Sequence, residues 1–158
     1  MNTPASLAER VGRLEDIEAI RALVATYALG ADRNNDPAIL GPLFADDGEW
    51  VCEGFGHYRG RSEIAAELAR IGREAIRWSL HYMVSPLVEV APDGRSARCR
   101  WYLWELARVA DGTANWIGGW YDSSLRKGEG GWAFSHVRLH LKLMSPHAEG
   151  WKTLPAAN

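Results

Sequence analysis

Three side chains could do acid–base chemistry in this chain, although a long stretch of sequence separates them. Tyr27 and Asp32 lie near the end of a helix-like segment, and His81 opens an apolar, strand-like run. A carboxylate beside an imidazole makes the ring a general base, because it holds the proton of one ring nitrogen and stabilises the imidazolium that forms. If the fold joins Asp32 and His81, the chain is a proton-transfer enzyme. Taken singly, the same residue types are ordinary as a core tyrosine and a helix-end carboxylate.

The segment 14–32 is predicted to be the helix that carries two of these side chains. Apolar residues recur along it every three or four positions and would form one stripe against a core. Tyr27 lies on the stripe, whereas Asp32 is five residues later and points about 140° away in projection. Both can reach one cavity only from its two flanks, or if the helix loosens near Gly30.

Two further helices are expected before the strands. Pro37 is placed to begin a short helix that runs through Phe44, and the Asp-Asp-Gly stretch at 46–48 should form a turn. Ser62 is a good N-cap for a second long helix at 63–75, because its hydroxyl can accept from amides of the first turn.

The remaining sequence favours strands joined by hairpin turns. One strand carries Trp50 and Cys52, and the later strands are predicted at 80–90, 96–109, 114–126 and 132–144. Helices that precede an antiparallel sheet indicate an α+β fold, with the sheet curved around the helices into a cone. The expected organisation is a lead-in at 1–13, a single domain at 14–144 and a polar tail at 145–158.

Composition excludes several classes of function. The chain has 158 residues and a net charge of −2, with basic residues scattered among acidic ones, so a nucleic-acid partner is not expected. No apolar run approaches the ~20 residues that cross a bilayer. The only cysteines, Cys52 and Cys99, lie in strand-like runs, and the first residues lack a basic then apolar pattern, which favours the cytoplasm.

Five stretches of the chain together resemble one known family. They are residues 20–32 (IRALVATYALGAD), 44–48 (FADDG) with Trp50, 58–61 (YRGR), 79–90 (SLHYMVSPLVEV) and the closing strand that starts Gly131-Trp132. This set resembles the SnoaL-like group of the nuclear transport factor 2-like superfamily over about residues 10–144. The resemblance is greatest to the branch with scytalone dehydratase, lindane dehydrochlorinase and bile-acid 7α-dehydratase. It implies a cone-shaped α+β barrel, with N-terminal helices packed in a strongly curved mixed or antiparallel sheet.

The resemblance also implies roles for individual residues. Asp32 and His81 match the branch's Asp–His dyad, Tyr27 matches a catalytic tyrosine of the bile-acid enzyme, and Arg138 falls where the dehydrochlorinase has a pocket arginine. A second histidine and an asparagine of scytalone dehydratase have no clear match, since the corresponding stretch 102–105 reads Tyr-Leu-Trp-Glu. Scytalone itself is therefore a doubtful substrate.

These roles describe a lyase that works by dehydratase-like elimination. His81 would remove a proton, Tyr27 would donate to the leaving oxygen or a carbonyl, and Arg138 would stabilise developing negative charge. The superfamily leaves other reactions open. They are a retro-aldol carbon–carbon lyase that releases a small aldehyde from an aromatic diol, a polyketide cyclase or isomerase, and a non-catalytic ligand-binding subunit like the β subunits of ring-hydroxylating dioxygenases.

Strand alternation suggests which side chains join the cavity. A two-residue turn at Asp111-Gly112 would place Tyr102 opposite Tyr121, on the face that also carries Trp104 and Ile117. On the last strand, Trp132, Phe134, His136, Arg138 and His140 would share a face that looks inward in the resembling fold. The substrate-binding candidates, which suit an aromatic or polycyclic molecule, are Trp50, Trp78, Tyr102, Trp104, Ile117, Tyr121, His136 and His140.

Two expectations concern assembly and metals. Trp101, Trp116 and Trp120 would fall on the outer face of the sheet, which predicts a homo-oligomer, with a trimer implied by the resemblance. His136 and His140 would be roughly 13 Å apart along one strand, too far to bind one ion together. The chain carries no phosphate loop, dinucleotide fingerprint or nucleophile elbow, so neither a metal nor an organic cofactor is expected.

Overall fold

The long N-terminal helix begins earlier than its apolar periodicity predicts. In the computed structural model, which describes residues 6–152, helix α1 spans Leu7–Asp32. The Ser6 hydroxyl accepts from the amide of Glu9, and the Glu9 carboxylate accepts from the amide of Ser6. This capping box satisfies two amides that lack partners within the helix and so fixes its first turn. The boundary expected after residue 13 therefore falls inside α1.

Of the other helices, α2 is short, and α3 begins at Arg61, one residue before the Ser62 that was expected to cap it. Pro37 begins α2, as predicted, and Ser62 lies inside α3 without capping it, because Gly60 holds the N-cap position with a φ of 86°. Glycine adopts this left-handed conformation without the penalty that a side chain brings. The bounds are Pro37–Leu40 for α2, Gly41–Leu43 for the 3₁₀ turn η1 and Arg61–Glu74 for α3.

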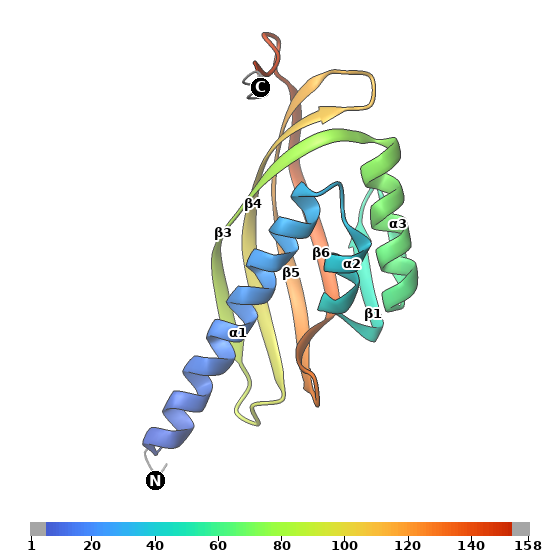
Figure 1. The fold of residues 1–158 in the computed structure, drawn as a ribbon. Coiled ribbons are helices and arrows are strands. Elements are labelled where there is room, and N and C mark those ends of the chain that lie inside the picture. The colour runs from blue at the N-terminus through green and yellow to red at the C-terminus, as the bar shows by residue number, and fades with distance from the viewer. Residues whose placement is uncertain (1–5, 153–158) are drawn as a thin grey trace, which may run out of the picture.

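Six strands form one mixed sheet that is not closed. Their bounds are Phe44–Cys52 (β1), Gly56–Arg59 (β2), Ile76–Val90 (β3), Ser96–Val109 (β4), Ala114–Gly128 (β5) and Gly131–Pro146 (β6). The order is β2-β1-β6-β5-β4-β3, and β1 runs parallel to β6 while all other neighbours are antiparallel. The sheet curves around α1, α2 and α3, which share one of its faces (Figure 1). The α+β cone expected from the sequence is confirmed.

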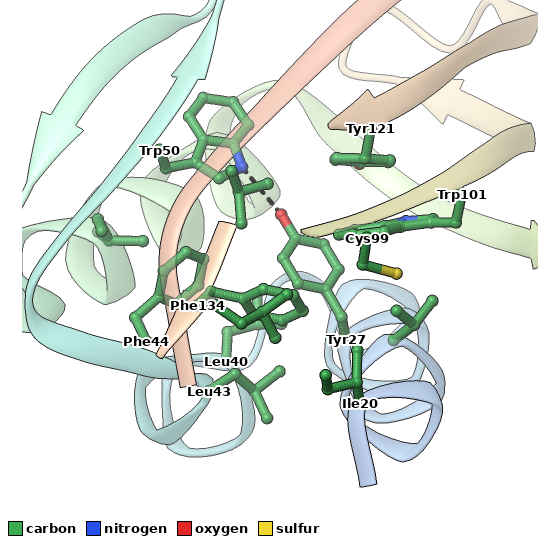
Figure 2. Close-up of a cluster of buried hydrophobic side chains, with 14 of the residues drawn as sticks. Ile20, Tyr27, Leu40, Leu43, Phe44, Trp50, Cys99, Trp101, Tyr121 and Phe134 are labelled. Carbon is green, nitrogen blue, oxygen red and sulfur yellow. Dashed lines mark hydrogen bonds between the residues drawn. The ribbon is translucent and has the colours of Figure 1, made fainter. Parts of the chain in front are cut away.

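Aromatic side chains fill the space between α1 and the sheet. Tyr27 from α1 meets the rings of Phe134 and Tyr121, and Trp101 stacks on Tyr121 with ring centroids 4.9 Å apart (Figure 2). Trp101 is fully buried, so its expected place on the outer face is wrong. Rings of this size bury large apolar areas, and this cluster therefore anchors the helix on the sheet.

The reason for the error at Trp101 is the turn between β4 and β5. The predicted two-residue turn is a three-residue loop at 110–112, in which the Val109 amide donates to the Thr113 carbonyl at 3.0 Å and Gly112 adopts a φ of 94°. Three-residue loops of this kind shift the pairing by one residue relative to two-residue turns. Because strand side chains alternate, a shift of one residue exchanges the two faces.

The shifted pairing moves two predicted cavity residues outward. Tyr102 pairs with Trp120 instead of Tyr121, and Trp104 pairs with Gly118. Tyr102 and Trp104 are 52% and 42% exposed, so neither lines the interior.

Bulges in β6 and β3 cause the other changes of face. Phe134 pairs with Leu125 and His136 with Ser124, which leaves Ser135 as an extra residue and reverses the alternation beyond it. A similar irregularity between Ile76 and Trp78 turns Trp78 away from the interior. The candidates that these bulges place outside are Trp78, His136, Arg138 and His140.

Candidate active site

Asp32 and His81 are joined by two hydrogen bonds. A single carboxylate oxygen of Asp32, Oδ1, lies 2.9 Å from Nδ1 of His81 and accepts the backbone amide of the same residue at 2.7 Å. The two bonds fix the ring relative to β3 and leave Nε2 as the nitrogen that faces away from Asp32. The contact predicted from the sequence is therefore present in the structure.

The end of α1 delivers Asp32 to this position. Arg33 ends the helix, and Asn34 and Asn35 both adopt positive φ, a conformation that asparagine tolerates better than most residues. The side-chain Nδ2 of Asn35 donates to the carbonyl of Leu68 in α3 at 2.9 Å and ties this turn to the second long helix. Asp32 thus approaches His81 from the helix end, while Tyr27 faces the interior one turn earlier.

His81 opens on a cavity between the sheet and the helices. The space between its lining atoms, with open solvent at its mouth included, is about 670 Å³. Most of the lining is apolar, and no lysine or arginine of residues 6–152 contributes to it. The polar lining consists of Tyr27, Asn34, Asn35, Ser79, His81, Glu105 and Tyr121; the apolar lining includes Trp50, Phe55, Leu68, Ile71, Ile117, Leu139 and Leu141.

Tyr27 holds its hydroxyl in the cavity through a neighbouring indole. Nε1 of Trp50 donates to the Tyr27 oxygen at 2.9 Å, as drawn in Figure 2. Burial raises the pKa of Tyr27 above its ordinary range, and the Trp50 and Tyr121 side chains oppose this only in part. Burial likewise raises the pKa of Tyr121. Both phenols therefore keep their protons at neutral pH and can act as hydrogen-bond donors.

A second carboxyl group, Glu105, stands on the other side of His81. The two residues are direct cross-strand partners on β3 and β4, and Oε2 of Glu105 lies 3.4 Å from Nε2 of His81. Glu105 is only 6% exposed, and this burial raises the pKa of its carboxyl group. Sequence reasoning missed this residue. The available signal was an acidic residue on the otherwise apolar odd-numbered face of the strand 96–109.

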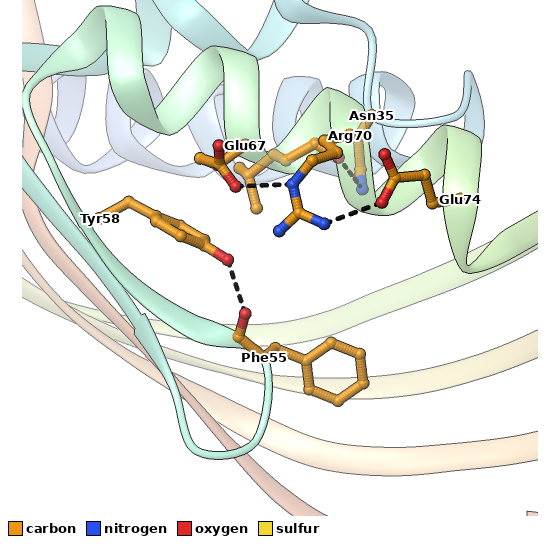
Figure 3. Close-up of polar contacts among 7 residues, drawn as sticks. Asn35, Phe55, Tyr58, Glu67, Arg70 and Glu74 are labelled. Atoms are coloured by element: carbon orange, nitrogen blue, oxygen red, sulfur yellow. Dashed lines mark hydrogen bonds and ion pairs between the residues drawn. The ribbon is translucent and has the colours of Figure 1, made fainter.

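One side of the cavity is built by α3 and by the loop between β1 and β2. Phe55 is held there because the Tyr58 hydroxyl donates to its carbonyl at 2.6 Å (Figure 3). Within α3, Arg70 pairs with Glu67 and Glu74, each at 2.9 Å. These contacts keep the loop and the helix in place as a wall.

Only some of the sequence-predicted residues reach the cavity. Tyr27, Trp50, His81, Ile117 and Tyr121 line the cavity, and Asp32 supports it from behind. The others lie outside it.

Arg138, expected to stabilise charge in the cavity, is among the residues outside it. It is exposed and stands opposite Asp122 in the β5–β6 pairing. His140 lies beside it on this face, stacked on Trp120 and 3.2 Å from Asp122. Arg138 therefore does not line the cavity in this structure.

The described residues contain neither a metal-binding cluster nor a membrane-spanning helix. Residues 6–152 contain no group of three His, Cys, Asp or Glu side chains arranged to hold a metal ion. Within the same range, no helix combines the length and apolar composition of a membrane span.

Solved structures with this fold include dehydrochlorinases. A hexachlorocyclohexane dehydrochlorinase, LinA type 2, superposes with a TM-score of 0.85 at 22% identity, over 94% of this chain and 99% of the other. LinA type 3 from Novosphingobium barchaimii LL02 gives 0.84 at 22% identity, over 92% and 99%. An NTF2-like protein with a cystatin-like fold from Novosphingobium aromaticivorans gives 0.73 at 28% identity, over 90% and 92%.

Comparison by sequence gives the family. No curated protein matches the chain. A family model for the SnoaL-like domain matches residues 12–138, which is most of the sequence. The chain therefore belongs to the SnoaL-like domain family, within the nuclear transport factor 2-like superfamily.

Proposed function

We propose that the protein is a lyase that eliminates water, or another small leaving group, from an apolar, aromatic or polycyclic small molecule. One observation carries the proposal: His81, bonded to Asp32 at 2.9 Å, opens on a largely apolar cavity. An oriented imidazole beside an enclosed apolar space is suited to removing a proton from carbon or from a hydroxyl group.

His81 is the base in this reaction. Asp32 accepts the Nδ1 proton, so the neutral ring keeps a lone pair on Nε2, the nitrogen toward the cavity. When Nε2 takes a proton, the carboxylate of Asp32 stabilises the imidazolium that forms. Asp32 therefore sets the tautomer of His81 and also stabilises its protonated form.

Tyr27 polarises the substrate. Its oxygen already accepts the Trp50 indole proton, so its own O–H is available to donate to a carbonyl or hydroxyl oxygen of the substrate. The raised pKa of Tyr27 favours this use, because the phenol stays protonated at neutral pH. Donors fixed before the substrate arrives stabilise charge that develops during the reaction.

The cavity lining favours a neutral substrate. Aromatic and aliphatic side chains such as Trp50, Phe55 and Ile117 can cover a ring system, and the described lining includes no cationic side chain to pair with a carboxylate or phosphate. We propose the cytoplasm as the compartment, since the only cysteines, Cys52 and Cys99, are free and buried.

A substrate panel tests the proposal. The purified protein is incubated with scytalone, hexachlorocyclohexane and neutral polycyclic β-hydroxy ketones, and mass spectrometry follows the products. We expect loss of water or of hydrogen chloride from at least one compound, and no such product with His81→Ala.

The alternative reactions give different products in the same assay. Release of an aldehyde would indicate a carbon–carbon lyase, and a product of unchanged mass would indicate an isomerase. Tight binding of panel compounds without any turnover would contradict the lyase and indicate a ligand-binding subunit.

A further inference from the structure

We propose that Glu105 is a catalytic residue, the general acid that protonates the leaving group while His81 removes the substrate proton. This inference rests on the proposed elimination and names the partner that His81 needs for it. The geometry points to Glu105 because its carboxyl group lines the cavity and lies 3.4 Å from Nε2 of the base.

The pairing of the two residues is built into the sheet. His81 and Glu105 are directly opposed on β3 and β4, with both side chains on the inner face. Ile117 stands opposite Glu105 on β5 and gives the carboxyl group an apolar neighbour. A glutamate with 6% exposure among such neighbours is costly to fold as an anion unless a partner offsets its charge.

The tautomer of His81 favours a proton on the Glu105 carboxyl group. Asp32 holds the proton of Nδ1, so a neutral His81 turns the lone pair of Nε2 toward the Glu105 carboxyl group. Two lone pairs at this distance repel each other, and a proton on the Glu105 carboxyl group removes the repulsion.

The groups around Glu105 favour the neutral acid. Its ionisable neighbours are His81 on β3, Asp32 and Tyr27 on α1, and Tyr121 on β5. Burial raises the pKa of Glu105, and the negative charge of Asp32 raises it further, whereas only a protonated His81 would lower it. Beside a neutral His81, both effects favour the protonated carboxyl group.

The elimination then balances as follows. Nε2 of His81 takes a proton from carbon, the carbon–hydrogen electron pair becomes the new carbon–carbon double bond, and the bond to the leaving oxygen breaks. Glu105 gives its proton to that oxygen, so water leaves. The site now contains an imidazolium beside a carboxylate, and return of the Nε2 proton to Glu105 across the 3.4 Å contact restores the starting state.

The placement of acid and base also defines the stereochemistry. Both groups belong to neighbouring strands of one wall, so the proton and the leaving group must depart from the same face of the substrate. We expect syn elimination, measurable with a substrate deuterated at one of its two prochiral positions. Deuterium loss from the opposite face would overturn the assignment.

A substrate-free measurement tests the proton on Glu105. In protein labelled with ¹³C at glutamate carboxyl groups, the Glu105 signal is the one absent from Glu105→Gln and present in Glu89→Gln, a matched control whose site is an exposed β3 residue. We expect the chemical shift of a protonated carboxyl group at pH 7. A shift typical of carboxylate at this pH would overturn the assignment of Glu105 as the acid.

A leaving-group comparison tests the catalytic role. Two substrates share a carbon skeleton that the wild type accepts, one with a hydroxyl and the other with a chloride as the leaving group. Chloride leaves without a proton, so Glu105→Gln should lower kcat for water loss by roughly 10²–10⁴-fold and kcat for chloride loss by less than about tenfold. Glu89→Gln should match the wild type with both.

The outcomes separate this proposal from the one on which it rests. Equal losses with both leaving groups would show a structural role for Glu105 and overturn the acid assignment, while leaving the lyase intact. No turnover by the wild type would overturn both the lyase and the catalytic role. In that case a protonated Glu105 carboxyl group would still establish the proton held beside His81.

Discussion

His81 is positioned by one oxygen atom, and this makes the dyad open to direct testing. His81→Ala should lower turnover by roughly 10²–10⁴-fold, because positioned proton transfer is worth about that much. Asp32→Asn should be comparably severe, since an amide can hold the wrong tautomer and cannot stabilise the imidazolium. Steady-state kinetics on an accepted panel substrate measure both. His57→Ala, at a half-exposed histidine paired with Glu49, is the control and should retain full activity. If His81→Ala kept most of the wild-type rate, the base would have to be another group.

The Tyr27 hydroxyl accepts a structural hydrogen bond from Trp50 and is proposed to donate a catalytic one to the substrate. One substitution, Tyr27→Phe, tests both roles. Tyr27→Phe keeps the ring in the aromatic core but leaves the buried Nε1 of Trp50 without its acceptor, which should lower the free energy of unfolding by about 1–3 kcal/mol. Turnover should fall less than in His81→Ala, because the phenol polarises the substrate and the base is intact. Urea denaturation and kinetics measure the two effects.

Glu105 should make stability depend on pH in a defined direction. Its pKa is raised in the folded state, so above its ordinary value of about 4.5 the folded chain holds a proton that the unfolded chain has lost. The contribution of Glu105 to the free energy of unfolding is therefore full below that pH and is lost as pH rises through the raised pKa. Compared with Glu105→Gln, the wild type should lose stability from pH 5 toward pH 9. Parallel denaturation curves for the two proteins across this range would contradict the prediction.

At the scale of elements, the junction of α1 and α3 controls where Asp32 lies. A Cβ on Gly72 in α3 would come within 2.2 Å of the backbone carbonyl oxygen of Asn34, so Gly72→Ala must displace the turn that follows Asp32. We expect a loss of about 1–3 kcal/mol in the free energy of unfolding, together with reduced turnover. Gly12→Ala in α1 is the matched control. No atom lies within 4 Å of its Cβ position, and it should stabilise the protein by up to about 1 kcal/mol. A Gly72→Ala variant as stable as the wild type would show that the turn can move freely.

Sequence patterns predicted where the helices and strands lie much better than which side chains of each strand point into the interior. The period of apolar residues found α1, the N-cap signal at Ser62 found α3 to within two residues, and hairpin signals found the four long strands, because these patterns are local. Which side chains of a strand face the interior depends on whether a loop or bulge contains one residue more or one fewer. One extra residue in the 110–112 loop and one at Ser135 reversed the expected alternation, and neither leaves a compositional signal.

The same physics explains which parts of the site were predictable. Asp32 and His81 stood out because their residue types suit one chemistry, and a family resemblance linked positions far apart in sequence. Glu105 left a sequence signal as the acidic residue on an apolar strand face, but only the register shows that it stands opposite His81. Arg138 was misplaced because its inward face was expected from alternation through Ser135, where the alternation breaks.

For the whole molecule, the outer face of the sheet predicts self-association. Tyr82, Trp104 and Leu143 lie in one cross-strand row and are each at least 39% exposed. Val84 and Tyr102 lengthen this apolar surface on β3 and β4. A monomer seldom leaves so much contiguous apolar surface in water, so we expect a homo-oligomer, with a trimer as the resemblance implies.

Charge placed on this surface should dissociate the oligomer. Trp104→Glu puts a carboxylate at the centre of the row, and light scattering at micromolar concentration should then report the monomer mass. Glu89→Gln, outside the row, should leave the assembly unchanged. A wild type that is already monomeric at this concentration would contradict the prediction.

The double hydrogen bond to Asp32 limits how this molecule can evolve. Because one oxygen orients the base and also fastens the end of α1 to the backbone of β3, a mutation at this position would impair activity and folding together. Substitutions that change the substrate are therefore expected at side chains that only line the cavity, such as Ile117, Leu139 and Leu141. Laboratory selection for altered specificity should find its accepted changes on those strands and leave Asp32 invariant.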